Sequence, residues 1–502
     1  MTALSPGRFA RSALAAMLAW DVCIQARYGF YAVYAVVTGF YLVVLDALPA
    51  SLVDRALVLV VVTDTAVLGF YFIGALVLIE KREGVLDALL VTPLGLRGYL
   101  LSKAASLTLL ATLASGVVVG FTHGTRVAVA PLLAGVALTA SLFVLVGVAA
   151  VARFDTVNRY FFGAVLYGAV LYAPVAGFLG VFDTAAFALL PLEPALVLVN
   201  AAFQGAAPAS LAYAVAYLLV GNVAAFLLAR HQLQRHVVAD AGAGTDDSPR
   251  EPGRLSAWLN GRVGPIGGLA LADARNWVRD PTLLLAASAP LALGALSRVG
   301  LPLANRQYLP GVALEPFYPV ALAFLVGFPP YIYGFIVGFF VLEDREQGTL
   351  TALAVSPLTA RGYLVYRGAT AYALGVVGVV VAVAVFGLET LAPWTFVGVA
   401  AVAGLAGPVS TFLFAALASD SIEGLAINKL LATTVVVPAL AILAVPTPLE
   451  YAAGLVPVYW PMKAAVLAAT GGGAAAIVGL LAVGAAYLGA CAVVLARRFA
   501  AA

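Results

Sequence analysis

Two stretches of the sequence, 264 positions apart, are near copies of each other. Residues 80–104 read EKREGVLDALLVTPLGLRGYLLSKA, and residues 344–368 read DREQGTLTALAVSPLTARGYLVYRG. Eleven of the 25 aligned positions are identical. In an apolar chain, shared leucine, alanine and valine could arise by chance, but shared Pro, Arg, Gly and Tyr at fixed spacing indicate an internal duplication.

The composition indicates that this duplication lies in a membrane protein. Of the 502 residues, 63% are hydrophobic and 10% are charged, whereas a soluble domain carries about 25% charged residues. The apolar runs do not alternate with period two, so they predict helices and not barrel strands. Since about 20 apolar residues cross a bilayer core, we expect about twelve spans, near 30–51, 56–79, 100–122, 127–151, 161–182, 211–230, 281–299, 318–342, 364–388, 393–418, 430–447 and 472–496.

The predicted spans divide into two groups of six. The long polar segment 232–265 is rich in Gly, Pro, Asp and Arg and is typical of a linker. It separates a first half, residues 1–231, from a second half, residues 266–502. Because six spans return the chain to its starting side, we expect two parallel six-helix repeats joined by a cytoplasmic linker.

Two further landmarks support the duplication. An Asp precedes the first span of each half and is followed six residues later by Arg, as in Asp21 with Arg27. Residues six apart do not face each other on a helix, so we interpret this spacing as shared ancestry and not as an ion pair. Each half also has a proline-rich apolar segment too short to cross, at 189–203 and 455–468.

The positions of the basic residues predict the orientation. With a cytoplasmic N-terminus, the outer loops would hold five of the 27 Lys and Arg residues, and the inner side the other 22. This bias predicts that both termini are cytoplasmic. The run before the first span lacks a clear cleavage site and is interpreted as a helix on the inner membrane surface. The expected location is the plasma membrane of a bacterial or archaeal cell, in contact with its lipids.

The repeated stretch has the features of a short helix between two spans. Acidic residues end the preceding span, and Gly84 and Gly348 allow a left-handed helix end. Leucines at helical spacing then give an apolar stripe, and a proline stops the element. One interpretation is a helix that only turns the chain at the membrane surface. The other is a docking element for a soluble partner.

The two stretches resemble the signature of ABC-2 type permeases, the membrane subunits of many ATP-binding-cassette exporters. The resemblance covers nearly the whole chain twice, and Gln347 departs from it where the first half has Glu83. It implies coupling helices at 83–93 and 347–357 that dock two ATPase subunits, the same or related, which would hold ATP and Mg²⁺. The implied docking residues are Glu80, Glu83, Gly84, Leu86, Leu89, Leu90, Pro93, Arg97, Glu343, Asp344, Glu346, Gly348, Leu350, Leu353, Pro357 and Arg361.

No motif of the sequence predicts an enzyme. A phosphate-binding GxxxxGK[ST] loop is missing, so ATP hydrolysis is expected in a partner protein. The three histidines and two cysteines form no metal-ligand spacing, and no nucleophile has a recognisable base. We therefore expect no cofactor, no metal and no catalytic residue in this chain, and no nucleic-acid partner.

Four residues are candidates for a substrate path. Asp64 lies inside the predicted second span, where a carboxylate is energetically costly. Either it binds a substrate or a proton, or it has a structural role only. Asn222 in the sixth span either lines the path or bonds a neighbouring helix. Pro329 and Pro330 are expected to kink the eighth span.

These features give one main hypothesis and two alternatives. The main hypothesis is a permease subunit that exports a hydrophobic or amphipathic compound such as a lipid or drug. The first alternative is a twelve-span secondary transporter driven by an ion gradient, which would need an intramembrane relay of charged groups. The second is a membrane scaffold subunit that transports nothing.

Overall fold

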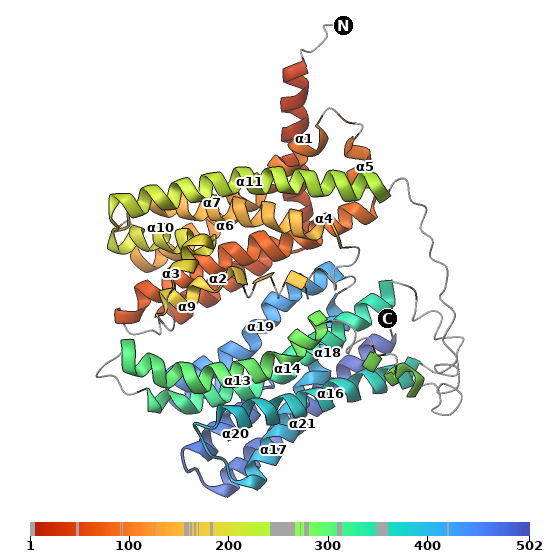
Figure 1. Ribbon diagram of the computed structural model, residues 1–502. Coiled ribbons are helices and arrows are strands. Elements are labelled where there is room, and N and C mark those ends of the chain that lie inside the picture. Colours follow the sequence, from red (N-terminus) through yellow and green to blue (C-terminus); the bar gives the residue numbers. More distant parts are fainter. Residues whose placement is uncertain are drawn as a thin grey trace. The chain divides into compact units, whose positions relative to one another are not determined.

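A computed structural model describes most of the chain. The described residues are 6–46, 50–90, 92, 94–124, 126–154, 160, 163–164, 167–168, 170–180, 184–240, 267–271, 273–275, 281–308, 314–346, 348, 360–418 and 421–501. Within these ranges every regular element is a helix and none is a strand (Figure 1). The predicted all-α class is therefore confirmed. The chain forms two compact units, Met1–Ser248 and Pro249–Ala502.

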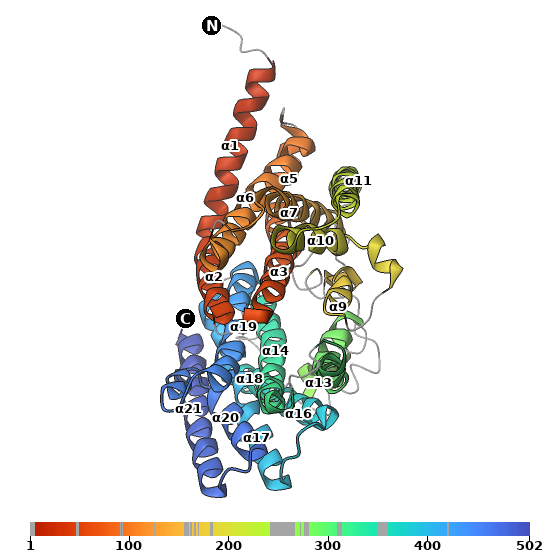
Figure 2. The ribbon, with the colours of Figure 1, turned by 90° about the vertical axis from the view of Figure 1, so that its left-hand side faces the viewer.

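The first unit is a bundle of long apolar helices. Its helices are α1 (Pro6–Arg27), α2 (Phe30–Asp46), α3 (Ala50–Val67), α4 (Ile73–Arg82), α5 (Val85–Leu90), α6 (Gly95–His123), α7 (Val129–Val151), α9 (Pro174–Phe178), α10 (Leu192–Gln204) and α11 (Pro208–Asp240). The axes of α1 and α2 differ by 63°, and Gly29 at the bend has a positive φ of 71°. A residue with a side chain rarely adopts that φ, so glycine makes this turn possible. The last part of α1 lies against α6, while its first part extends beyond the other helices of the unit (Figure 2).

An irregular helix runs through the first unit. A π-helical turn, Leu68–Phe72, joins α3 to α4 within one candidate span, Val53–Lys81. The turn packs closely on α7, since a Cβ added to Gly69 would lie 2.9 Å from the backbone nitrogen of Val144. A Cβ added to Gly147 would lie 3.0 Å from the backbone oxygens of Gly69 and Phe70. Small residues of this kind let membrane helices approach each other.

We expect Gly147→Val to destabilise the first unit by about 1–3 kcal/mol, the usual cost of overpacking a core. Two of the added Cβ atom's neighbours are backbone oxygens that cannot move aside alone. The measurement is thermal unfolding of the purified chain. Gly116→Val is the control, because nothing lies within 4 Å of a Cβ at Gly116. Equal melting temperatures for the two variants would contradict this account of the packing.

The second unit surrounds a central helix. Its helices are α13 (Pro281–Tyr308), α14 (Tyr318–Glu346), α16 (Ala360–Phe386), α17 (Pro393–Gly404), α18 (Ala406–Leu417), α19 (Ser421–Ala444), α20 (Tyr459–Ala469) and α21 (Ala474–Ala501). Helix α14 is largely buried and contacts α16, α18, α19 and α20. It continues as a helix through Pro329 and Pro330.

The described helices include eight that are long and apolar enough to cross a membrane, or nine if α1 and α2 form one broken span. A multi-pass membrane protein is thus confirmed, while the layout of twelve spans with both termini inside stays a prediction. Part of the predicted fifth span, 161–182, lies outside the described residues. Helices α10 and α20 have 13 and 11 residues. As predicted, both are too short to cross, since about 20 residues are needed.

Candidate functional site: two matching charge clusters

The loop between α4 and α6 folds as the repeated stretch predicts. Gly84 has a positive φ of 68° directly after α4, and the short helix α5 begins at the next residue. The Thr92 hydroxyl donates a hydrogen bond to the Leu89 carbonyl at 2.8 Å, where α5 has ended. The glycine turn and the short helix of the first half are therefore confirmed.

The apolar stripe of α5 faces its own unit. Leu86 and Leu89 are buried, and α5 packs against α4, α6 and α11. Ala88 of α5 is exposed, as are Glu83 before the helix and Thr92 after it. A partner protein would therefore meet the exposed face, while the leucines anchor the helix.

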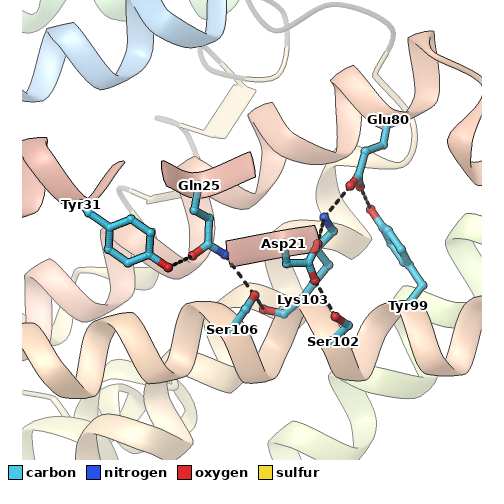
Figure 3. Close-up of polar contacts among 8 residues, drawn as sticks. All are labelled: Asp21, Gln25, Tyr31, Glu80, Tyr99, Ser102, Lys103 and Ser106. Carbon is cyan, nitrogen blue, oxygen red and sulfur yellow. Dashed lines mark hydrogen bonds and ion pairs between the residues drawn. The ribbon is translucent and has the colours of Figure 1, made fainter. Parts of the chain in front are cut away.

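A buried ion cluster lies where α1, α4 and α6 meet (Figure 3). The Lys103 Nζ atom lies 2.6 Å from Asp21 Oδ1 and 2.5 Å from Glu80 Oε1. Tyr99 donates a hydrogen bond to the other Glu80 oxygen at 2.7 Å, and Ser102 donates one to the other Asp21 oxygen at 2.5 Å. All five residues are buried. Such a charge group is tolerated in an apolar interior only because its members satisfy each other.

The helix spacing explains how the cluster assembles. Met17, Asp21 and Gln25 recur every four residues and form the buried face of α1. Gln25 donates a hydrogen bond to the Ser106 hydroxyl on α6 at 3.0 Å, one turn after Lys103. Tyr31 in turn donates one to Gln25 at 3.1 Å (Figure 3). A polar seam therefore fixes α1 to α6.

The second unit holds a matching cluster around Arg367 of α16. Its guanidinium lies 2.8 Å from Asp273 Oδ2 and 2.7 Å from Asp344 Oδ2. Tyr363 donates a hydrogen bond to Asp344 at 2.5 Å, and Tyr366 donates one to Asp273 at 2.6 Å. The Arg367 side chain is 4% exposed, and those of Asp273 and Asp344 are 18% and 21% exposed. This cluster is more open to its surroundings than that of Lys103.

The two clusters use the same positions of the repeat. Four members of the first cluster, at positions 80, 99, 102 and 103, have counterparts exactly one repeat of 264 residues later, at 344, 363, 366 and 367. Asp21 and Asp273 complete the match. The sequence contains both charged partners, the Asp before the first span of each half and the Lys or Arg of the repeated stretch. The spacing of the Asp to the next Arg, however, indicates only shared ancestry. The partner of Asp21 is not Arg27 six residues away but a lysine 82 residues away.

The other predicted docking residues fall into four groups. Glu80 and Asp344 belong to the clusters, whereas Glu83 and Arg97 are exposed. Gly348 has the predicted positive φ, at 72°, and Glu343 and Glu346 end α14. The remaining side chains lie outside the described residues: Leu90, Pro93, Leu350, Leu353, Pro357 and Arg361.

Two of the substrate-path candidates have defined surroundings. The Asn222 amide donates hydrogen bonds to the Leu138 carbonyl on α7 at 2.9 Å and to the Leu218 carbonyl at 2.8 Å. It thus bonds a neighbouring helix, as one of the two predictions for it stated. Asp64 is half-buried in α3 and accepts a hydrogen bond from Tyr41 at 3.1 Å.

Comparison with known proteins gives one match for each half. The family described as "Fluoroquinolones export permease protein family" matches residues 12–241, and that described as "Fluoroquinolones export permease protein Rv2686c-like" matches residues 273–496. The fluoroquinolones export permease protein Rv2687c of Mycobacterium tuberculosis is 33% identical over 226 residues, 44% of this chain and 95% of that protein. The chain belongs to the fluoroquinolone export permease family.

A second relative in this family is also about half as long as this chain. The fluoroquinolones export permease protein Rv2686c of the same organism is 32% identical over 199 residues, 38% of this chain and 78% of that protein. Each of these two permeases is therefore about half as long as the present chain. No solved structure matches the chain. Membership in this family supports a role as a transport permease subunit.

Proposed function

We propose that this permease is the membrane subunit of an ATP-driven ABC exporter, energised by two separate ATPase subunits that hold ATP and Mg²⁺. The observation that carries the proposal is the Lys103 cluster beside the exposed face of α5, together with its counterpart around Arg367. In each half the cluster joins the end of the helix before the repeated loop to the helix after it, through Glu80 and Lys103 in the first half and through Asp344 and Arg367 in the second. The lack of a phosphate-binding loop in the sequence is consistent with ATP hydrolysis in a partner.

The first cluster gives a physical route from the loop to the bundle. Helix α5 follows α4 and precedes α6, and Lys103 joins both of these helices to α1 through Glu80 and Asp21. A displacement of α5 by a closing ATPase dimer would therefore move three helices together, because buried packed elements shift as units. The second cluster would do the same for the other repeat.

The docking surface of the first unit extends from α5 onto α1. A pocket of about 280 Å³ lies between α1, α4 and α5, and its walls include Trp20, Arg27 and Glu83. Opposite charges and an aromatic ring in one concavity suit a partner's protruding side chains. We place the ATPase contact at this pocket and the exposed face of α5.

The two relatives suggest the substrate and the subunit arrangement. Both bear names that describe export of fluoroquinolones, so we propose an amphipathic aromatic drug of this kind as substrate. Because each relative is about half as long as this chain, we propose that one copy here does the work of two half-length permeases. One chain would then bind two ATPases.

The test is to purify the full chain gently from its native membrane and to measure its partners and its energy source. We expect an ATPase to co-purify at two copies per chain, and drug export to stop when ATP is depleted while the ion gradient is kept. Export that follows the ion gradient without ATP would instead establish the secondary-transporter alternative. A chain that exports nothing but assembles other proteins would establish the scaffold.

A further inference from the structure

A carboxylate lies among tyrosines inside the membrane-spanning part of the first unit. Asp64 is the twelfth residue of the candidate span Val53–Lys81. At a rise of 1.5 Å per residue it lies about 16 Å along the helix, near the middle of a bilayer core about 30 Å thick. An acidic side chain at that depth is costly and marks a functional site by default.

Tyrosines of two other segments lie in the neighbourhood of this carboxylate. Tyr41 on α2 donates a hydrogen bond to Asp64 Oδ1 at 3.1 Å. Tyr34 lies seven residues before Tyr41, two helical turns away, and is therefore on the same face of α2. Tyr172 donates a hydrogen bond to the carbonyl of Thr63 at 3.3 Å, which fixes it beside α3. Because Asp64 and Tyr41 are both half-buried, the group can be reached from outside the unit.

The helix carrying Asp64 is irregular next to this group. The π-helical turn begins at Leu68, one turn after Asp64, and single π-helical turns inside α-helices are frequent at functional sites. Its residue Phe72 contacts the Tyr34 ring edge-on at 6.1 Å between centroids. The second unit has no carboxylate at the equivalent position, where Phe328 stacks on Phe324 at 5.6 Å. The acidic group therefore belongs to one half only.

We infer that Asp64, with the rings of Tyr34, Tyr41 and Tyr172, binds the protonated amine of the exported compound. A carboxylate neutralises an organic ammonium, and aromatic faces attract it through their quadrupoles. This inference rests on the proposed function, and it adds the chemical class of the substrate. Tyr41 is a positioning residue, since its hydroxyl holds the carboxylate through a hydrogen bond.

The experiment compares two drugs that differ in one charge. Ciprofloxacin carries a basic piperazine nitrogen, and its N-acetyl derivative carries a non-basic amide at the same place. In Asp64→Asn we expect binding and export of ciprofloxacin to fall about 10- to 100-fold, the effect of losing a hydrogen bond to a charged group. Binding and export of the N-acetyl derivative should be unchanged in this variant.

Further variants test the role of the carboxylate. Asp64→Glu should recover part of the lost binding and export of ciprofloxacin, and Tyr41→Phe should reduce them less than Asp64→Asn does. Asp54→Asn, at a half-exposed acid of the same helix, is the control and should change neither.

Binding to the purified full-length chain separates the two proposals. Ciprofloxacin that binds wild type but not Asp64→Asn supports the amine site even if export proves independent of ATP, in which case only the proposed energy source fails. Equal losses for both drugs, in a variant that reaches the membrane at the wild-type level, would show that Asp64 does not recognise the amine. Equal affinity of wild type for both drugs, or binding of neither, would also overturn the inference.

Discussion

Lys103→Met is expected to lower the stability of the first unit by about 3–5 kcal/mol, the usual cost of removing one partner from a buried ion pair. Lys103 is 1% exposed, and its partners Asp21 and Glu80 are 0% and 3% exposed. Without the lysine two carboxylates would be left facing each other in an apolar interior. The measurement is thermal unfolding of the purified chain. Arg97→Gln, an exposed cation on the same helix α6, is the control and should change stability by less than about 0.5 kcal/mol.

The matching change in the second unit should cost less. Arg367→Met leaves Asp273 and Asp344, whose side chains are 18% and 21% exposed and can be partly hydrated. We therefore expect the melting temperature to fall less than in Lys103→Met. An equal or larger fall would contradict the argument from burial.

A triple variant distinguishes stability from transmission of movement. Replacing Asp21 and Glu80 by leucine together with Lys103→Met removes all the cluster's charges, and buried ion groups replaced in this way often keep or gain stability. We expect such a variant to recover much of its melting temperature but to transport poorly, because α1 would no longer be tied to α4 and α6 by directional bonds. Full transport in a stable triple variant would show that the cluster serves stability only.

The sequence predicted those features that depend on local patterns. Apolar runs predicted the all-α membrane class, and the glycine followed by leucines at helical spacing predicted the turn at Gly84 and the helix α5. These features arise within a few neighbouring residues. The number of spans did not follow in the same way, because a predicted span such as 430–447 only overlaps α19, Ser421–Ala444, whose first residues are less apolar.

The charge clusters could not be predicted in the same way, because they join residues far apart in the chain. Lys103 meets Asp21 across 82 positions and Glu80 across 23. Helical spacing relates residues three or four apart and gives no rule for such pairs. The face of α5 was also undetermined, since an apolar stripe fits a partner and the protein's own helices equally well. Only the packing of α5 on α4, α6 and α11 decides it.

Two neighbouring residues of α5, one exposed and one buried, test where an ATPase docks. Ala88 is exposed and Leu89 is buried. Ala88→Asp should leave the melting temperature within about 0.5 kcal/mol of wild type, as surface changes usually do. If α5 is the docking element, the added charge should reduce the amount of ATPase that co-purifies with the chain.

Leu89→Asp should behave differently, because it places a charge between α5 and its own unit. An unpaired buried charge belongs to the most destabilising class of substitution, and we expect a loss of about 3 kcal/mol or more. Loss of ATPase binding in Leu89→Asp alone would therefore follow from unfolding of the loop and would not locate the contact. Loss in Ala88→Asp at wild-type stability would locate it. Wild-type ATPase binding by Ala88→Asp would place the contact elsewhere, since the exposed face of α5 is the part that a partner could reach.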